Sequence, residues 1–586
     1  EIEAAVEAGK KTELDINLNR EKYIPVAAEG AMLYFMITQL NAINHMYQYS
    51  LDSFMLYFFK AIREAPASDT VEERVASLRT TLRLAIYTWV SRGLFEDHKL
   101  VLLSQLTFQL MARKKLGDDV EFIPHYFKFL VSPSRRMGEA RPGVVAEWLD
   151  EPSWNAVQGL AALEGDEFAR LPSDLEEASG RFREWYNHVT PETEKLPLDW
   201  SALDKEPFKK LLVLRCMRPD RLTVAMNSFV EQTLPAGRDF TECDGTLSSL
   251  QVLDATFKDS LPNTPIYFIL SPGADVVADL DQMAVTYGFP KGEKYHNVSM
   301  GQGQEKIAEE KLALAHKQGH WVILNNVHLM PRWLTRLEKI LDTFALDNEG
   351  RGSHEDFRLF LTSEPAAGIP IGILNRSIKL TNEPPTGLKA NLKRAFCSFK
   401  PELINDIDSK QRSILFGLCH FHAIMIERKK FGPIGFNMMY PFSLGDLRDS
   451  SVCLANYMEN ASGKIPWEDL RYIFGQIMYG GHIVNDFDRL LCVTYLEFYM
   501  RDELLDEMEL FPFNRDEKDA TFMSPSPTTY DRYVEHISTG IKGDTPIAFG
   551  LHPNAEIGFR TDRSEQFFLL LQELQPRDAA ATEGAS

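Results

Sequence analysis

The sequence predicts a chain of mixed class: an α/β unit built on a parallel sheet, followed by an all-α unit. Two patterns indicate this. In the middle of the chain, short runs rich in β-branched and aromatic residues alternate with stretches of helical spacing, which is typical of a parallel sheet covered on both faces. After residue 385 the apolar residues recur at helical spacing only. With 586 residues, of which 44% are hydrophobic, the chain is long enough for several sizeable cores.

The first 150 residues are predicted to be helical. Residues 3–20 are charged with sparse apolar positions, as in an exposed helix or one member of an antiparallel helical pair. Pro25 is expected to end this helix, because proline lacks the backbone N–H that a helix interior needs. Residues 31–61 are apolar on nearly all sides and are therefore expected to be buried. Residues 71–113 continue the helical bundle.

The strands of the α/β unit are predicted from short apolar runs. The candidates are residues 211–214, 266–270, 295–300, 321–324, 357–362 and 377–380. Helical patterns between the central strands cover residues 275–287, 302–318 and 331–343. This alternation predicts one parallel sheet.

The C-terminal part is predicted to be all-α and to end in a linker. Helical patterns cover residues 388–399, 411–427, 444–460, 467–478 and 487–508. Residues 511–514 and 523–527 contain several prolines and are expected to link this unit to a truncated final segment. The predicted divisions of the chain are residues 1–150, 151–385, 386–510 and 511–586.

Charge and composition argue against several classes of partner. The formal net charge is −21, which disfavours nucleic acid and anionic membrane surfaces. The longest apolar regions, 31–43 and 54–62, are shorter than the roughly 18–20 residues of a membrane span, so no span is expected. The six cysteines form no C-x-x-C pair, which favours reduced thiols over disulfides or zinc. Position 1 is Glu and no leader follows, so we expect a fragment of a longer chain.

Residues 266–287 have the layout of a phosphate-binding loop: a strand, a turn that ends at Gly273, and a helix. Phosphate binding there requires G-x-x-x-x-G-K-[ST]. With this pattern aligned on Gly273, Ala278, Asp279 and Leu280 stand at the positions of Gly, Lys and Ser/Thr. A lysine ~4 Å from a phosphate attracts it by about 4 kcal/mol at an effective dielectric of ~20, and Asp279 repels it by a similar amount. The loop is therefore interpreted as a degenerate P-loop.

The second half of such a site is altered as well. It normally consists of a hydrophobic strand that ends in Asp-Glu, which holds the metal and activates water. Strand 321–324 ends instead in Asn325 and Asn326, whose neutral amides cannot take a proton from water. Thr362 and Ser363 stand where a γ-phosphate is normally sensed. With no phosphate held there, their side chains are expected to be hydrogen-bonded within the protein and to have only a structural role. We predict no catalytic residue, no bound cofactor and no metal in this segment.

A glycine-rich turn suggests two further types of site, and neither pattern is complete. Gly301-Gln-Gly303 lies between a strand and a helix, as in a dinucleotide fingerprint, but Lys306 replaces the third glycine. The next strand ends in Asn325 rather than in the acid that binds a ribose hydroxyl, so a tight turn is the better interpretation. Residues 297–301 resemble a nucleophile elbow with Asn in place of the first Gly.

Two groups of histidines and acids are candidate metal ligands. His420 and His422 stand at i and i+2 of a predicted helix, so they point to different faces and a shared metal is disfavoured. His482, Asp486 and Asp488 follow a glycine turn, and a helix N-terminus that favours acidic side chains explains them without a metal.

Taken together, these segments resemble a known family, the dynein heavy chain. The resemblance extends over nearly the whole chain, and the departures Phe436 and Phe487, where Trp is usual, are aromatic exchanges. The motifs that carry it are Tyr23-Ile-Pro-Val-Ala27, Met46-Tyr-Gln-Tyr-Ser-Leu51, Arg92-Gly-Leu-Phe-Glu96, Leu214-Arg-Cys-Met-Arg-Pro-Asp-Arg221, Ile269-Leu-Ser-Pro-Gly-Ala-Asp275, Gly301-Gln-Gly-Gln304, Gly319-His-Trp-Val-Ile-Leu324, Leu361-Thr-Ser-Glu-Pro365, Thr381-Asn-Glu-Pro-Pro385, Phe431-Gly-Pro-Ile-Gly-Phe-Asn437 and Tyr479-Gly-Gly-His-Ile-Val-Asn-Asp-Phe-Asp488.

The resemblance implies a segment from the end of the fifth AAA+ module, through a degenerate sixth module with its helical lid, into the start of the C-terminal domain. Residues 551–559 are more similar to the axonemal branch than to the cytoplasmic one, and residues 574–578 suggest an outer-arm chain. The charged N-terminal helix is expected to be the end of the buttress that supports the stalk.

For function, the resemblance implies an ATP-driven, minus-end-directed microtubule motor of cilia or flagella, located in the cytoplasm, the cytoskeleton and the axoneme. ATP and magnesium are expected in other modules, and this segment is expected to transmit force. The implied partners are the first and fifth modules, the stalk and buttress, the C-terminal domain, intermediate and light chains, and microtubules. Two alternatives stay open: a non-motor scaffold with a decayed P-loop domain, and a dinucleotide-binding enzyme.

Overall fold

The computed structural model describes residues 2–113, 121–136, 140–241, 249–271, 274, 276–346, 352–383, 386–460, 464–506, 508–513, 522–541 and 546–575. The chain divides into two compact units, which are described separately. Unit 1 comprises Glu1–Ser271, Asp275–Glu383 and Thr561–Ser586, and unit 2 comprises Pro272–Ala274 and Pro384–Arg560.

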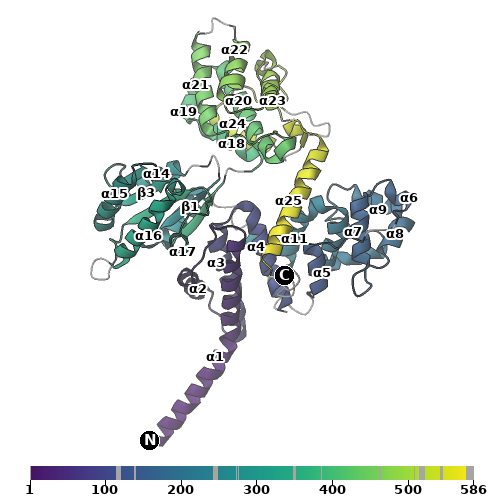
Figure 1. Cartoon of the computed structure of the whole chain (residues 1–586), viewed down its shortest axis with the longest axis vertical. Helices are drawn as coiled ribbons and strands as arrows, with labels where there is room; N and C mark the ends of the chain where they lie inside the picture. The colour runs from purple at the N-terminus through teal and green to yellow at the C-terminus, as the bar shows by residue number, and fades with distance from the viewer. Residues whose placement is uncertain are drawn as a thin grey trace, which may run out of the picture. The chain divides into compact units, whose positions relative to one another are not determined.

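Within its described residues, unit 1 contains a five-stranded parallel sheet with the strand order β2-β3-β4-β1-β5 (Figure 1). The strands are β1 (Ile266–Leu270), β2 (Tyr295–Ser299), β3 (Trp321–Asn325), β4 (Arg358–Ser363) and β5 (Ile378–Asn382). The prediction of these runs as strands of one parallel sheet is confirmed. Because β1 lies inside the sheet while β2 lies at an edge, the connections change direction beside β1, where sheets of this kind bind ligands.

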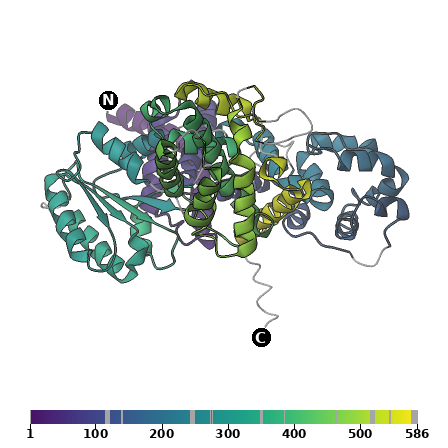
Figure 2. The same ribbon diagram turned by 90° about the horizontal axis from the view of Figure 1, so that it is seen from above.

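Helices cover both faces of the sheet (Figures 1 and 2). On one face, α15 (Glu305–Gln318), α16 (Pro331–Leu346) and α17 (Ile371–Arg376) share a hydrophobic cluster with Val322 and Leu324 of β3. Neighbouring residues of a strand point to opposite faces, so the remaining residues of β3 need a second cover.

Trp321, the first residue of β3, packs on that second face. Its side chain is fully buried and stacks on Phe289, with 4.5 Å between the ring centroids, while Phe257 lies at 5.0 Å. Phe257 comes from α13 (Ser249–Asp259), and Phe289 follows α14 (Val277–Thr286). The sheet is therefore the middle layer of three.

The prediction of a strand at residues 211–214 is wrong. These residues lie in α10 (Pro207–Met217), in which every residue from Lys210 to Met217 is buried. A helix that is buried all round has no polar stripe, so periodicity cannot distinguish it from a buried strand. Pro207 in the first turn is the local sign of a helix start.

The expected helix break at Pro25 is also wrong. Helix α1 runs without interruption from Ile2 to Thr38, with Pro25 inside it. Pro25 deprives the carbonyl of Glu21 of its hydrogen-bond donor, but both residues are exposed, so water can replace the lost partner. The buried carboxylate of Glu29 then fixes α1 to its neighbour α3 (Val71–Ser91) by accepting from two arginines, Arg79 and Arg83.

The expectation that residues 31–61 are wholly buried needs correction. Met32, Leu33 and Met36 are buried, but Phe35 is 65% exposed and Leu56 is 58% exposed. These exposed apolar side chains lie on α1 and on α2 (Leu51–Glu64).

The rest of unit 1 is helical, apart from the sheet. These helices are α4 (Glu96–Ala112), α5 (Pro124–Val131), α6 (Gly143–Ala146), α7 (Glu151–Ala161), α8 (Leu171–Glu177), α9 (Ser179–Tyr186), α11 (Leu222–Thr233), α12 (Gly237–Thr241) and the C-terminal part of α25 (Pro553–Glu573). Arg215 of α10 fastens α25 by donating to both carboxylate oxygens of Glu565, at 2.6 and 2.9 Å.

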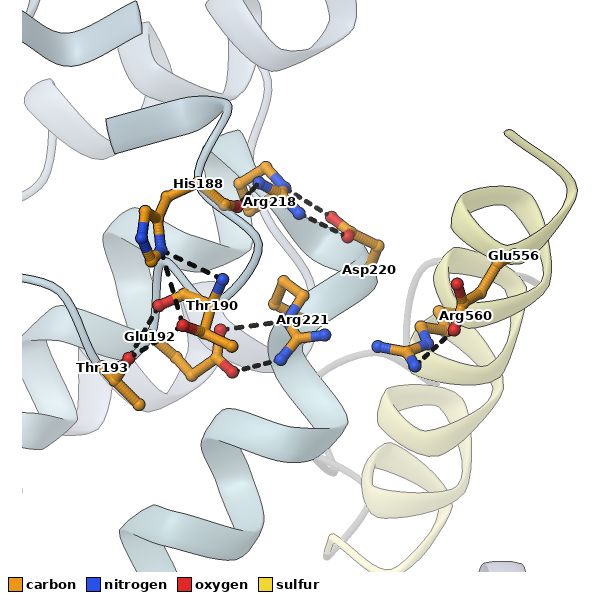
Figure 3. A network of polar contacts seen from close by, with 9 residues as sticks. All are labelled: His188, Thr190, Glu192, Thr193, Arg218, Asp220, Arg221, Glu556 and Arg560. Atoms are coloured by element: carbon orange, nitrogen blue, oxygen red, sulfur yellow. Dashed lines mark hydrogen bonds and ion pairs between the residues drawn. The ribbon is translucent and has the colours of Figure 1, made fainter. Parts of the chain in front are cut away.

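Two further arginines fix the region between α9 and α11 (Figure 3). Arg218 donates to both carboxylate oxygens of Asp220 at 2.9 Å, and Arg221 donates through Nε to Glu192 at 3.0 Å. His188, on the adjoining loop, accepts a hydrogen bond from the backbone of Thr190. The two arginines of the Arg-Pro-Asp-Arg motif therefore have structural roles, in ion pairs that hold these segments together.

The sheet and the N-terminal helices meet along strand β5. The backbone N–H of Thr381 donates to the carbonyl of Arg92 at 2.8 Å, and its hydroxyl donates to the carbonyl of Leu94. Gly93 makes this approach possible, because a Cβ there would lie 2.9 Å from Cβ of Lys379. The segment from Arg92 to Leu94 therefore covers the free edge of β5.

Unit 2 is all-α around the long helix α20, in agreement with the prediction. Its helices are α18 (Leu388–Cys397), α19 (Pro401–Asp406), α20 (Ser409–Arg428), α21 (Leu444–Asn460), α22 (Trp467–Tyr472), which continues as a π-helical segment (Ile473–Met478), α23 (Asp486–Tyr499), α24 (Tyr530–Gly540) and the first part of α25. Nearly all of α20 from Ser413 to Arg428 is buried.

Two described residues of the predicted linker, Phe511 and Phe513, belong to the core of unit 2 together with the adjacent Phe522. Phe511, Phe513 and Phe522 are each 2% exposed and lie in the same hydrophobic cluster as α20. Pro512 forms an antiparallel bridge with Met523. Proline content alone suggested a linker, whereas the three aromatic side chains decide the packing.

Among the described helices, none is long and apolar enough to cross a membrane. The cysteines within the described residues are all free thiols, and Cys216, Cys419 and Cys492 are buried. Cys243 lies outside the described residues.

Candidate functional site

The carboxyl ends of β1 and β5 open onto a cavity of about 220 Å³ in unit 1. Parallel sheets of this type place phosphates at this edge. The lining residues are Arg92, Lys99, Val252, Leu253, Phe268, Val276, Asp279, Leu380, Thr381, Asn382 and Glu383. The cavity therefore combines an apolar floor with two cationic and two anionic side chains.

The degenerate loop borders this cavity. Gly273 lies outside the described residues. Asp279 stands in the first turn of α14, half-buried, and lines the cavity. Ala278 is exposed and Leu280 is fully buried. The strand and the helix thus occur where they were predicted, whereas most of the turn between them lies outside the described residues. The repulsion of phosphate by Asp279 stays a prediction.

The end of β3 forms a separate hydrogen-bonded network. Asn325 donates through Nδ2 to Oδ1 of Asn297 at 2.7 Å and accepts at Oδ1 from the hydroxyl of Thr362 at 3.3 Å. The backbone N–H of Asn326 donates to the same hydroxyl at 3.1 Å. Asn326 has φ +56°, a left-handed conformation that asparagine tolerates better than most residues. We call Asn297, Asn325, Asn326 and Thr362 the amide network.

The neighbouring hydroxyl is satisfied in the same way. Ser363 is fully buried and accepts a hydrogen bond from the hydroxyl of Tyr267 at 2.7 Å. The expectation that Thr362 and Ser363 are hydrogen-bonded is therefore confirmed. Neither side chain lines the cavity, so the structure does not bring the end of β3 and Asp279 into one pocket.

Glu383 closes the cavity on the side of the N-terminal helices. Its Oε2 accepts from the backbone N–H of Glu96, the first residue of α4, at 2.7 Å. Burial raises the pKa of the Glu383 carboxyl, while the hydrogen bond from Glu96 and the ammonium of Lys99 lower it. The carboxylate of Asp97 raises it further. Glu383 is exposed to solvent, and the N–H at the start of α4 stabilises its charged form.

The cations of the cavity have carboxylate partners. Arg92 lies 3.8 Å from Asp259, which also accepts from Lys60 at 2.6 Å. Lys99 lies 2.8 Å from the carboxylate of Glu96. These pairs consume much of the attraction that an added phosphate would need.

Comparison with known proteins gives the family. Residues 261–381 match the model for the dynein heavy chain region D6 P-loop domain, and residues 411–555 match the model for the dynein heavy chain AAA lid domain. The first match covers the sheet and the second covers most of unit 2. The chain belongs to the dynein heavy-chain family. The predicted fold class, a P-loop sheet module followed by a helical lid, is thus confirmed, whereas the degeneracy of the loop stays a prediction.

Several dynein relatives match this chain along its whole length. It is 42% identical to human dynein axonemal heavy chain 9 over 600 residues, which cover 100% of this chain and 12% of that protein. It is 41% identical to the ciliary dynein beta chain of Heliocidaris crassispina (99% of this chain, 12% of that protein). It is also 41% identical to the flagellar outer arm dynein beta chain of Chlamydomonas reinhardtii (100% and 13%). The chain therefore spans about an eighth of the length of these relatives.

Sequence reasoning missed the residues that line the cavity from the helical side. Arg92, Lys99 and Glu383 were assigned no role as site residues. A signal was present, since Arg92 and Glu383 lie in two of the motifs that carry the dynein resemblance. The structure shows that these motifs, almost 300 residues apart, meet at the end of β5.

The glycine-rich motif at 301–304 is a turn in this dynein segment, as interpreted. Strand β2 ends at Ser299, Gly303 adopts φ +88°, and α15 begins at Glu305. The position where a dinucleotide site needs an acid holds Asn325, whose amide is bonded to Asn297. The geometry therefore gives the dinucleotide hypothesis no support.

The two histidines of α20 have separate surroundings in unit 2. His420 is fully buried and stacks on Phe513, with 4.3 Å between the ring centroids. Nδ1 of His422 forms a hydrogen bond with the hydroxyl of Tyr479 at 2.8 Å. Burial lowers the pKa of His420 to about 3 and that of His422 to about 4, so both rings are neutral. They pack the lid core.

The acids near His482 also have structural roles. Asn485 caps α23 by accepting from the backbone of Asp488, as the helix-start interpretation expects. His482 pairs with Asp446 at 2.8 Å, whereas Asp488 accepts from the Tyr440 hydroxyl at 2.7 Å. Among the described residues, no group of three or more His, Cys, Asp or Glu is arranged to hold a metal ion.

Proposed function

We propose that this chain is a force-transmitting part of the motor ring of an axonemal dynein heavy chain and hydrolyses no ATP itself. Its sheet and lid match dynein modules, and the relatives named above are axonemal, ciliary or flagellar dyneins. In this proposal the segment passes rearrangements between neighbouring modules through packed elements with alternative arrangements.

The whole heavy chain would then be an ATP-driven, minus-end-directed microtubule motor of the ciliary or flagellar axoneme, with an outer-arm type as the finer proposal. ATP and Mg²⁺ would be bound by other modules. The partners of this segment would be the first and fifth modules, the buttress and stalk, and the C-terminal domain. Intermediate chains, light chains and microtubules would bind elsewhere in the heavy chain.

The amide network carries the proposal. At the end of β3, where a hydrolytic module holds its metal with acids, Asn325 is bonded on both sides by neutral partners. A neutral amide cannot act as a general base, and its oxygen is already engaged by Thr362. Asp279 and Glu383 add two negative charges to the cavity wall, which disfavours a polyphosphate.

The test is photoaffinity labelling of the full-length protein with an azido-ATP in the presence of Mg²⁺, followed by mass spectrometry of the labelled peptides. We expect label on peptides of other modules and none on the peptides that contain Arg92, Asp279 or Glu383. If these peptides are labelled, and excess Mg·ATP prevents the labelling, the proposal that this segment binds no nucleotide is overturned. The other modules serve as the internal positive control.

The alternatives make different predictions in the same protein. A dinucleotide enzyme would retain NAD or flavin absorbance after purification, and no observation at β2 or β3 favours this. A non-motor scaffold would lack intact GK[ST] modules upstream of this segment, and the sequence of the full-length transcript decides that point.

A further inference from the structure

We propose that the outer edge of β2 is a docking site for an extended segment of the same heavy chain, which adds to the sheet as a further strand. This proposal rests on the proposed function, because it needs a heavy chain that extends beyond the present residues. The docked segment carries an apolar side chain and a carboxylate, both of which face α15.

The first argument is the direction of the backbone groups of β2, which lies at one end of the strand order. In a parallel pair, alternate residues of a strand bond to the neighbouring strand, and the residues between them face away. The carbonyl of Lys294 and the N–H of Met300 both bond to β3, at 2.8 and 2.9 Å. The odd-numbered residues Tyr295, Asn297 and Ser299 therefore present their N–H and C=O groups to the outer edge.

Of these three residues, Tyr295 is covered by the turn that precedes β2. Its N–H donates to the carbonyl of Pro290 at 3.2 Å, and its carbonyl accepts from Gly292 at 2.9 Å. No backbone partner for the outward groups of Asn297 and Ser299 occurs in the part of the chain that the structure describes. Ser299 is exposed and Asn297 is half-buried. Two residues of this edge are thus open for the addition of a strand.

The second argument is the flank of α15 that borders this edge. The opposite flank faces α16, because Glu309 accepts from Nε1 of Trp333 at 3.0 Å. Ile307, Lys311 and Leu314 are spaced along the flank that is turned away from α16. The side chains of Ile307 and Leu314 are 44% and 38% exposed. An apolar stripe with a lysine at its middle is therefore available to a docked strand.

The position of Lys311 beside β2 follows from its effect on two histidines. Burial lowers the pKa of His296 in β2, and the ammonium of Lys311 lowers it further. Burial also lowers the pKa of His320, which is bonded to His296 at 3.0 Å, with additional effects from Lys294, His354 and Lys311. No carboxylate among the described residues forms an ion pair with Lys311. This lysine therefore favours a strand that brings a carboxylate.

The third argument concerns the source of the docked strand. Two open residues offer at most four backbone hydrogen bonds, and the net gain from each is small because a free peptide is already bonded to water. A free peptide also loses its translational freedom on binding, whereas a segment of the same chain has an effective concentration of about millimolar. The chain spans about an eighth of the length of its relatives, so in the proposed motor most of the polypeptide lies outside it.

The test is hydrogen exchange of the full-length heavy chain, resolved by fragmentation mass spectrometry to single amides of β2. The amides of Asn297 and Ser299 should exchange at least about tenfold more slowly than unprotected amides. Exchange of both at the unprotected rate would overturn the proposal. The amides of His296 and Val298 face β3 and report whether β2 is folded.

Two pairs of variants show whether a docked strand causes this protection. Ser299→Pro removes an outward N–H without removing a bond to β3, so it should raise exchange at Asn297 about tenfold, whereas Ser299→Ala should leave it unchanged. Lys311→Glu should raise exchange at Asn297 several-fold, whereas Lys317→Glu, at an exposed position on another face of α15, should not. Equal exchange within either pair would contradict a docked strand.

Carbodiimide cross-linking of the full-length protein identifies the docked segment, because it joins lysine amines to carboxylates in contact with them. A cross-link from Lys311 to a peptide of the same heavy chain supports the proposal, whereas cross-links only to another protein or to a second copy would overturn it. Azido-ATP labelling of the peptide that contains Asp279 would overturn the proposed function but would leave slow exchange at β2 unexplained by nucleotide. Unprotected amides at Asn297 and Ser299 without such labelling would overturn the docking site alone.

Discussion

The carboxyl edge of the sheet has two sides that are built from different chemistry. At the ends of β3 and β4, the neutral side chains of Asn297, Asn325 and Thr362 bond to one another. At the ends of β1 and β5, charged side chains such as Asp279 and Glu383 line a cavity of about 220 Å³. Both sides belong to unit 1 and to the same sheet.

Under the proposed function, the two sides are two ways of replacing a nucleotide site. In the amide network the polar groups satisfy each other, so its stability should not depend on ions or on pH. The cavity keeps charges and balances them internally. The following variants test this contrast.

The largest effect on stability should come from Trp321, which packs the sheet that carries both sides against its covering layer. Trp321→Ala removes a fully buried side chain between Phe257 and Phe289 and should lower the free energy of opening of the sheet by about 3–5 kcal/mol. Native-state hydrogen exchange at β3 and β5 measures this. Trp321→Phe is the conservative control, and a loss confined to β3 would contradict a shared support.

The next largest effects on stability are expected from two threonine substitutions, one at the amide network and one beside the cavity. Thr362→Val leaves the N–H of Asn326 and the amide oxygen of Asn325 without their partner, at a cost of about 1–3 kcal/mol. Thr381→Val removes one hydroxyl donor to the carbonyls of Arg92 and Leu94, at a cost of about 0.5–1.5 kcal/mol. Hydrogen exchange of β4 in Thr362→Val and of β5 in Thr381→Val measures the two losses of stability. A larger loss in Thr381→Val would contradict the claim that the groups of the amide network satisfy each other.

A pH-dependent effect should appear in β5, the strand next to the cavity. Lys379 of β5 is buried, donates to the carbonyls of Gln48 and Leu374, and lies over the ring of Tyr49 at 4.3 Å. Burial lowers the pKa of Lys379 from 10.5 to about 7. The unfolded chain keeps this proton up to its ordinary pKa while the folded chain releases it near 7. Stability should therefore rise with pH from about 7 to 10, by up to about 1.4 kcal/mol per pH unit.

Lys379→Met should remove this rise, and the exposed-lysine control Lys291→Met should retain it. The measurement is the free energy of opening of β5 at pH 7, 8 and 9, corrected for the intrinsic exchange rate. An equal slope in Lys379→Met and the wild type would exclude this lysine as the cause.

The smallest effect is expected at the degenerate loop itself. Asp279→Asn removes a negative charge from the first turn of α14 and should cost about 0.3–1 kcal/mol in the opening of that helix. Because the amide network is unchanged in this variant, azido-ATP should still leave no label on the peptide that contains position 279. Labelling of this variant would show that the single acid had been the barrier to nucleotide.

The sheet was predictable because each strand is a local pattern of β-branched and aromatic residues between turn signals. The hydrogen-bonded state of Thr362 and Ser363 was predictable for a related reason: both are polar residues at the end of a buried strand. Periodicity failed at α10, where burial on all sides removes the polar stripe, and at Pro25, where exposure to water makes a proline tolerable inside α1.

The part of the site that could not be predicted depends on long-range packing. Glu383 meets Glu96 only because β5 lies at the end of the strand order, next to the N-terminal helices. Neither residue has a local sequence context that indicates a cap. The same limit applies to Phe511 and Phe513, which a proline-rich context suggested were in a linker and which pack in the core of unit 2.

The cover over β5 affects how this region behaves when the chain is shortened. An outermost strand with unpaired N–H and C=O groups is a template for pairing with other molecules, and here the carbonyl of Arg92 takes the N–H of Thr381. A protein that starts beyond residue 96 would lose this contact at the edge of β5. Such a truncation should form intermolecular β-structure and precipitate, even though every strand of the sheet is still present.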